Sequence, residues 1–119
     1  MIYKVAVVGA GSISKAHMNG YNLNKDRVEV VGVVDPYKIA QDEFKDQYSI
    51  KNSYSSIDDL FKDCTPDIVS ICTWHSLHHV QTIDIAKRGV KAIIWEKPMA
   101  IGSGPAQEMV DVCKENNVE

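Results

Sequence analysis

The sequence lacks the features that mark several large classes of protein. No apolar run approaches the ~20 residues of a membrane span, and we see no internal repeat, low-complexity tract or linker. Lys and Arg number 13 against 16 Asp and Glu, and neither half of the chain is strongly basic, which argues against a reader of nucleic-acid phosphates. Residues 1–4 lead straight into a strand pattern, so we expect no signal peptide and a cytoplasmic protein.

The sequence also has few cysteines. Cys64, Cys72 and Cys113 are odd in number and far apart, so we expect reduced and mostly buried thiols rather than a disulfide framework.

What is present is an alternation of apolar runs and helical patterns within 119 residues, enough for one ordinary domain. The runs are β-branched and apolar nearly throughout, as in strands of a parallel sheet that is covered on both faces. We expect these strands at Tyr3–Val8, Val28–Val34, Ile68–Cys72 and Val90–Trp95, with a further short strand near Lys51–Tyr54.

Helical patterns fill the intervals between the strands. Ser56 and Asp59 resemble a capping box, Ser76 is expected to cap a later helix, and Gly89 suits the left-handed residue that ends it. We expect helices at 12–23 and 37–48, and a short third helix from 57 onward. A fourth helix should run from its Ser76 cap to Arg88, and a fifth should begin at Gly104-Pro105.

This order of elements predicts an α/β domain, a doubly wound, mostly parallel sheet of the Rossmann type with helices on both faces and right-handed crossovers. Because an order of this kind usually continues into another strand, we expect residues 1–119 to lack the last strand of the domain.

A glycine-rich turn lies where the first strand becomes the first helix, in Gly9-Ala10-Gly11-Ser12-Ile13-Ser14. Gly9 permits the tight turn, and Gly11 lets the backbone approach a pyrophosphate. The amides of Ser12 and Ile13 would then face the phosphates, helped by the helix dipole. Ser14 takes the place of the usual third small residue.

An acidic residue follows 24 positions after Gly11, at the end of the second strand. Asp35 can accept hydrogen bonds from the adenosine ribose hydroxyls, and its charge would repel a 2′-phosphate. We therefore expect NAD rather than NADP, although Lys38 lies near enough in the sequence to weaken that preference. The alternative is a plain glycine turn in which Asp35 caps a helix.

Three further segments carry a resemblance to a known family. His17 falls eight residues after Gly9, residues 71–78 read Ile-Cys-Thr-Trp-His-Ser-Leu-His, and Glu96-Lys97-Pro98 follows a buried strand. With the glycine turn, these segments resemble the NAD(P)-binding domain of the Gfo/Idh/MocA oxidoreductases over essentially the whole chain.

The resemblance implies a nicotinamide-dependent dehydrogenase that acts on a hydroxyl or keto group of a sugar, nucleotide sugar or inositol. It implies that Lys97 is the catalytic residue, orienting the substrate hydroxyl and relaying its proton, and that Glu96 fixes the cofactor end of the site. It also places Thr73, Trp74 and His78 on the cofactor side, with His78 as a local hydrogen-bonding residue.

Trp74 and His75 depart from the family pattern, which has proline and asparagine there. Trp74 could stack near the nicotinamide or adenine, wall the substrate pocket, or simply pack. A cofactor contact by His75 is in doubt because an imidazole differs chemically from an amide.

The resemblance further implies a second domain that carries the substrate pocket. Half a cleft cannot hold a substrate against the nicotinamide, so we expect the 119 residues to bind the dinucleotide weakly and turn over little. We also expect exposed apolar surface and an open sheet edge to favour self-association, with a homo-oligomer as one outcome.

Three other interpretations remain. A stand-alone NAD-binding regulatory module would suit the short length, but it would not need Lys97. A zinc site could use Cys72, His75, His78 and His79, although we expect no metal. A methyltransferase usually has an acidic residue just before its glycine loop, where this chain has Val7 and Val8.

Overall fold

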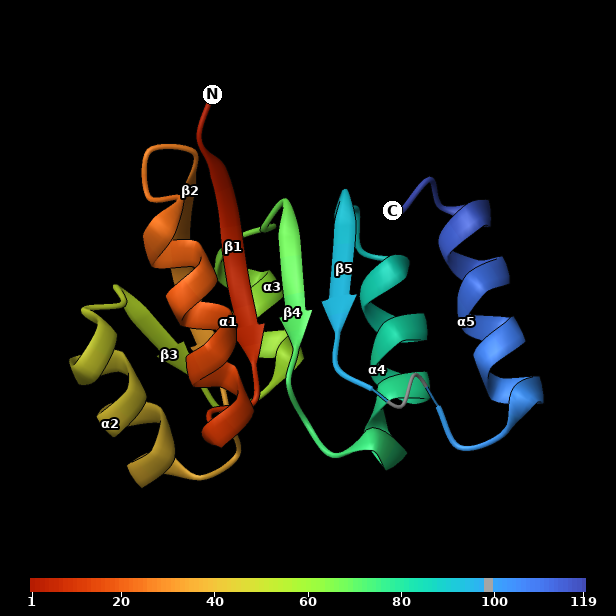
Figure 1. Ribbon diagram of the computed structural model, residues 1–119, viewed down its shortest axis with the longest axis horizontal. Coiled ribbons are helices and arrows are strands. Elements are labelled where there is room, and N and C mark those ends of the chain that lie inside the picture. The colour runs from red at the N-terminus through yellow and green to blue at the C-terminus, as the bar shows by residue number, and fades with distance from the viewer. Residues whose placement is uncertain (98–99) are drawn as a thin grey trace.

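The computed structural model describes residues 1–97 and 100–119, and in it helices and strands alternate along the chain (Figure 1). The elements are β1 (Tyr3–Val8), α1 (Ser12–Leu23), β2 (Val28–Val34), α2 (Lys38–Tyr48), β3 (Asn52–Tyr54), α3 (Ile57–Asp63), β4 (Ile68–Ile71), α4 (His75–Ala86), β5 (Ala92–Trp95) and α5 (Ser103–Glu115).

The strands form one sheet in the order β3-β2-β1-β4-β5, and every neighbouring pair is parallel. The chain winds outward from β1 to β3 and then returns to add β4 on the other side of β1. The winding direction therefore reverses between β1 and β4, and in open α/β sheets ligands bind at the carboxyl ends of the strands on either side of such a reversal. The predicted doubly wound Rossmann fold is confirmed.

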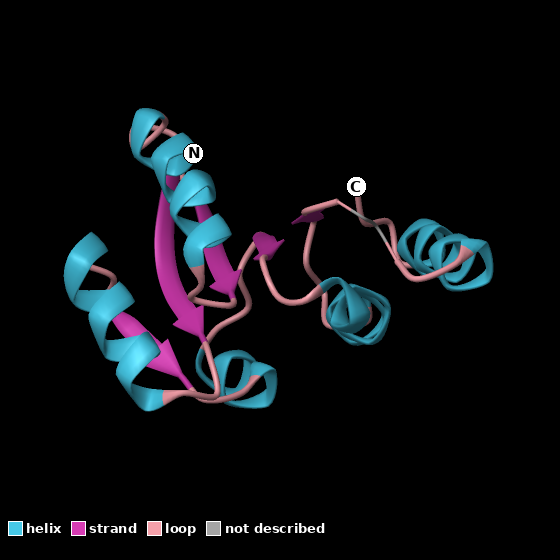
Figure 2. Cartoon of the chain, turned by 60° about the horizontal axis from the view of Figure 1, so that its bottom comes forward, coloured by secondary structure: helices cyan, strands magenta, loops and turns pink. Residues whose placement is uncertain are grey.

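Two apolar cores lie on opposite faces of the sheet, as the alternation of side chains along β1 requires. One core contains Val7, Val33 and Met18 and is covered by α1 and α2. The other contains Val8, Val69 and Ile85 and is covered by α3, α4 and α5. Figure 2 shows α1 and α2 side by side along one face, with the other helices away from it. The parallel strands are thus apolar on both faces, as their sequence predicted.

The helix ends agree with the sequence patterns at α3 and after α4, and differ from them at the start of α4. Ser56 caps α3, since its Oγ accepts a hydrogen bond from the Asp59 amide at 3.1 Å, and Gly89 has the expected positive φ of 89°. The prediction that Ser76 caps α4 is wrong. The cap residue is Trp74, whose carbonyl accepts from the Leu77 amide at 2.9 Å, so Ser76 lies inside the first turn and the helix ends at Ala86.

Other boundaries shift by one or two residues. β5 begins at Ala92 rather than Val90, because the amides of Lys91 and Ala92 both donate to the Asp67 carbonyl before the strand pairing starts. β4 ends at Ile71, α2 begins after its cap residue Tyr37, and α5 begins at Ser103.

The last residue of the chain pairs with β5. The Glu119 amide donates to the Lys91 carbonyl at 2.9 Å, and the Ile93 amide donates to the Glu119 carbonyl at 3.0 Å. Two bonds from one residue to both neighbours of Ala92 have the pattern of a parallel pair. A sixth strand at this edge stays a prediction. No helix in the described part of the chain is long and apolar enough to cross a membrane.

Candidate functional site

The phosphate turn begins with a glycine that the backbone itself requires. Gly9 has a φ of 99°, and its amide donates to the Val34 carbonyl at 2.7 Å, which holds the turn against β2. A Cβ at this position would lie 2.9 Å from the Cys72 carbonyl oxygen. Both the conformation and the contact exclude other residues, so Gly9 is explained by the fold alone.

Gly11 is different, because nothing in the fold requires a glycine there. It is the cap residue of α1 with an ordinary φ of −83°, and a Cβ on it would meet nothing within 4 Å. The space above it is open, and Ser12 and Ile13 are exposed beside it. Amides in a first helical turn lack partners within the helix, so this end of α1 offers donors to an anion at a position without a side chain.

Ser14 fits the place of the third small residue. It is completely buried, and its hydroxyl donates to the Gly11 carbonyl. α1 can therefore pack closely on the sheet with serine in this position.

Asp35 lies beside the turn. Its Oδ2 accepts from the Ala10 amide at 3.0 Å, and its Oδ1 accepts from the Tyr37 amide at 2.9 Å. The second bond shapes the entry into α2, so the alternative role of Asp35 at a helix start is also present. Each carboxylate oxygen has a further lone pair, which leaves acceptors for ribose hydroxyls. Lys38 is occupied elsewhere, paired with Asp42 at 2.9 Å on the exposed surface of α2.

The segment between β4 and α4 presents a large aromatic side chain to solvent. Trp74 is 79% exposed, which excludes plain packing within this chain, and His75 beside it is also exposed. The Thr73 hydroxyl donates to the Gln81 side chain at 2.5 Å, and the buried His78 ring lies 3.0 Å from the Thr73 carbonyl. Thr73 and His78 thus fix the loop from which Trp74 projects.

The segment after β5 brings Glu96 to α1. Its Oε1 lies 2.7 Å from His17 Nε2, and His17 Nδ1 lies 3.1 Å from the buried Ser70 hydroxyl, which also hydrogen-bonds to Tyr21. Lys97 is exposed at the same edge. Pro98, the last residue of the Glu96-Lys97-Pro98 motif, lies outside the described residues.

The sequence motif includes His17 but gives no sign of its partners Ser70 and Glu96. The available signal was its position in the second turn of α1 with Tyr21 four residues later, which places both on one face. That the face points at Ser70 and Glu96 depends on strand order, which the sequence pattern does not specify.

The three cysteines are free, and two of them are buried as predicted. Burial, followed by the nearby charge of Glu96, raises the pKa of Cys72 to about 12, so this thiol is not an activated nucleophile. Residues 1–97 and 100–119 contain no group of three His, Cys, Asp or Glu side chains that could hold a metal ion.

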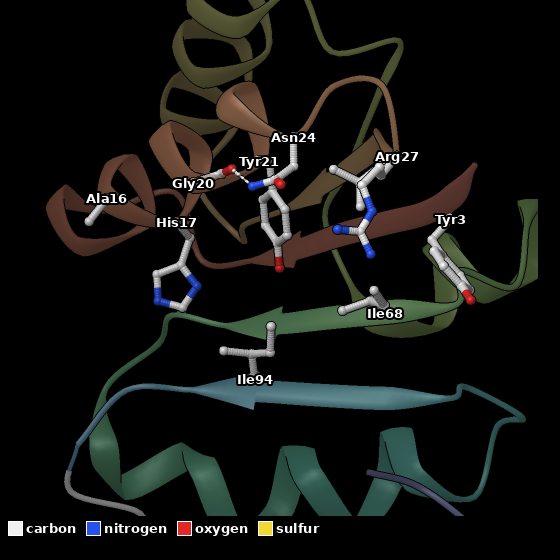
Figure 3. Close-up of a pocket in the computed structure, with 10 residues that line it drawn as sticks. Tyr3, Ala16, His17, Gly20, Tyr21, Asn24, Arg27, Ile68 and Ile94 are labelled. Carbon is white, nitrogen blue, oxygen red and sulfur yellow. Dashed lines mark hydrogen bonds between the residues drawn. The ribbon is translucent and has the colours of Figure 1, made fainter. Parts of the chain in front are cut away.

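A hollow of about 460 Å³ lies away from the phosphate turn, on the α1 face of β4 and β5. In Figure 3 it extends along α1 from His17 near the carboxyl ends of the strands to Tyr3 and Arg27 near their amino ends. Ile94 contributes an apolar side chain that is 46% exposed. The polar contacts of the candidate site thus border this hollow only at His17 and Tyr21.

Comparison with known proteins agrees with this geometry. A family model described as an oxidoreductase family with an NAD-binding Rossmann fold matches residues 3–119. An uncharacterized oxidoreductase of Streptococcus pneumoniae is 34% identical over 115 residues, covering 97% of this chain and 30% of that protein. D-glucoside 3-dehydrogenase of Escherichia coli is 24% identical over 111 residues, covering 93% of this chain and 31% of that protein.

Among solved structures, the WlbA dehydrogenase of Bordetella pertussis in complex with NADH and UDP-GlcNAcA superposes with a TM-score of 0.93 at 29% identity. The match covers 99% of this chain and 36% of the dehydrogenase. The chain therefore spans about a third of the length of the relatives that it matches.

Proposed function

Since the chain belongs to the Gfo/Idh/MocA oxidoreductases, through the NAD-binding Rossmann domain of that family, we propose that it binds NAD at the carboxyl ends of β1, β2 and β4. The observation that carries this proposal is the contrast at the turn, where Gly9 is required by the fold and Gly11 is not. A glycine with open space above it, at the start of a helix and beside a carboxylate, suits a diphosphate and its adenosine ribose.

Each side chain of the site then has a role toward the dinucleotide. Gly9 shapes the turn and Gly11 leaves room for the diphosphate, which accepts from the amides of Ser12 and Ile13. Asp35 accepts from the ribose hydroxyls. Thr73 and His78 hold the loop from which Trp74 projects toward the nicotinamide side, and Glu96 and Lys97 complete that end. The bound cofactor would supply a hydride acceptor or donor.

For the whole protein, we propose oxidation or reduction of a hydroxyl or keto group on a sugar, nucleotide sugar or inositol-like substrate. Lys97 is the catalytic residue, because an exposed ammonium at this edge can hold a hydroxyl and stabilise a developing alkoxide. Support comes from relatives whose names include a D-glucoside 3-dehydrogenase and a dehydrogenase bound to UDP-GlcNAcA. The 119 residues alone hold one wall of such a cleft, so we expect cofactor binding without turnover.

NAD is favoured over NADP. In the proposed binding mode a 2′-phosphate would face the negative charge of Asp35, and the cation nearest in the sequence, Lys38, is already paired with Asp42. The position that would have to attract the extra phosphate thus repels it.

The test is calorimetric titration of the chain with NAD and with NADP, for the wild type and for Asp35→Asn. We expect the wild type to bind NAD more tightly than NADP. In the variant the ratio of the NAD affinity to the NADP affinity should fall by on the order of tenfold, because repulsion of the 2′-phosphate is removed. Asp46→Asn, an exposed carboxylate on the same helix as Lys38, is the matched control and should change neither affinity. Equal wild-type affinities would contradict the cofactor choice, and binding of neither would contradict the function.

A stand-alone regulatory module that senses NAD is the second interpretation. It predicts that Lys97→Ala changes nothing beyond cofactor affinity, whereas the oxidoreductase interpretation predicts loss of substrate turnover in the whole protein with NAD binding nearly intact.

A further inference from the structure

A continuous chain of polar side chains crosses beneath α1. It joins Tyr21 and His17 on α1 to Ser70 on β4 and to Glu96 directly after β5. Ser70 is fully buried, the His17 side chain is 10% exposed, and the Glu96 side chain is 34% exposed. This network of side chains therefore runs from the interior of the sheet face to the carboxyl end of β5, next to Lys97.

The hydrogen bonds of this chain can all be satisfied at once with a neutral imidazole. Tyr21 donates to Ser70, the Ser70 hydroxyl donates to His17 Nδ1, and His17 Nε2 donates to the Glu96 carboxylate. Each proton has an acceptor. A buried polar network that is fully satisfied favours a single arrangement of its members.

The packing of α1 on the sheet does not require this network. α1 is already attached to the sheet by Met18, which is buried in the apolar core of that face. The neighbouring surface that borders the hollow is apolar, with Ile68 and Ile94. Placing a histidine and a carboxylate here instead of further apolar residues costs desolvation that closer packing would avoid.

What the network does provide is a link between the two ends of the proposed site. α1 begins at the phosphate turn, and Glu96 is the residue immediately before Lys97. A hydrogen bond of 2.7 Å from His17 fixes the carboxylate of Glu96 relative to α1. The backbone that carries Lys97 is thereby held at a set distance from the helix that binds the diphosphate.

We propose that His17 is a positioning residue, which fixes the Glu96 carboxylate and through it forms the nicotinamide end of the cofactor site. This inference rests on the proposed function. It predicts that His17 contributes to binding of the nicotinamide riboside half of the dinucleotide and contributes nothing to binding of the adenosine diphosphate half.

The test compares two ligands, ADP-ribose and NAD, by titration calorimetry on the chain. ADP-ribose reports the phosphate turn and Asp35, and the additional affinity for NAD reports the nicotinamide end. His17→Asn has a side chain too short to reach Glu96, whereas His17→Gln can still donate to it. The matched control is His79→Gln, since His79 pairs with Glu108 on α5 at 3.1 Å, outside the network.

We expect His17→Asn to lower the ratio of NAD affinity to ADP-ribose affinity by on the order of tenfold, which is the value of a hydrogen bond to a charged group. Its ADP-ribose affinity should stay within about twofold of the wild type. His17→Gln should retain most of the additional affinity, and His79→Gln all of it. Glu96→Gln should reproduce the loss, and the double variant His17→Asn/Glu96→Gln should lose no more than either single variant.

Equal losses for both ligands in His17→Asn would overturn the inference, because they would show a general support of α1. An unchanged additional affinity, or a wild type that binds both ligands equally, would also overturn it. A wild type that binds ADP-ribose not at all would instead refute the proposed function.

Discussion

The two glycines of the turn show that residues of one motif can be present for unrelated reasons. Gly9 adopts a positive φ, and a Cβ on it would clash with the Cys72 carbonyl, so it would be needed in a protein with no ligand. Gly11 adopts a conformation open to any residue and faces empty space. The sequence motif includes both glycines, but only the structure shows that the fold requires Gly9 and leaves Gly11 to be explained by a ligand.

Alanine substitution should separate them in solution. Gly9→Ala should lower the free energy of unfolding by about 2 kcal/mol or more, from backbone strain and the clash with Cys72. Gly11→Ala should cost less than about 1 kcal/mol, the loss of a tolerated cap residue. Urea denaturation measures both, and NAD titration of the folded Gly11→Ala variant should show the larger loss of affinity. A Gly11→Ala variant with wild-type NAD affinity would contradict the assignment.

At this same scale, the sequence predicted the positions that its motifs name, and it missed the partners that join them. Asp35 was predicted to face a ribose, whereas its bond to the Ala10 amide follows from how β1 and β2 end beside each other. The bond from His17 to Glu96 joins residues 79 positions apart. Such contacts depend on strand order and on helix rotation, which local patterns do not encode.

At the scale of the element, the ranges of β1, α1 and β2 agreed with the sequence, because apolar runs and glycines mark their ends. α4 did not, because the start of a helix can be set by backbone bonds alone. The Leu77 amide bonds to the Trp74 carbonyl, and no capping side chain is involved. A serine near a helix start is therefore not sufficient to identify a cap.

Two serines test that distinction. Ser56→Ala should lower the free energy of unfolding by about 1 kcal/mol, because the Asp59 amide loses its acceptor. Ser76→Ala, a change of the same chemistry in the first turn of α4, should stay within about 0.5 kcal/mol of the wild type. Urea denaturation of both variants checks the pair. A cost at Ser76 as large as that at Ser56 would restore the original prediction for α4.

At the scale of the whole molecule, several wholly or partly buried acidic side chains favour their neutral forms. Burial raises the pKa values of Cys72, Cys113, Cys64 and Tyr21 above their ordinary values, and that of Cys72 from 9.0 to about 12. In the unfolded chain these groups ionise at lower pH than in the folded protein. The stability they contribute is complete below about pH 9 and declines as the pH rises toward 12.

The urea midpoint should therefore fall steadily between pH 9 and pH 12, the interval between the two pKa values of Cys72. Cys72→Ala should flatten this dependence, because the most strongly shifted of the thiols is gone. Measurements must be made with a reductant present. A midpoint that is constant over this interval would contradict the burial of these groups.

The bond from the Ala10 amide to Asp35 also bears on how coenzyme choice could be changed. The carboxylate that would repel a phosphorylated ribose is the same group that ties the glycine turn to the end of β2. Replacing Asp35 with a residue that has no acceptor, such as alanine or a cationic side chain, would leave the Ala10 amide without its partner. A redesign for NADP would thus have to introduce a replacement acceptor for that amide together with the new positive charge. A single substitution that supplies only the charge would destabilise the glycine turn that binds the coenzyme.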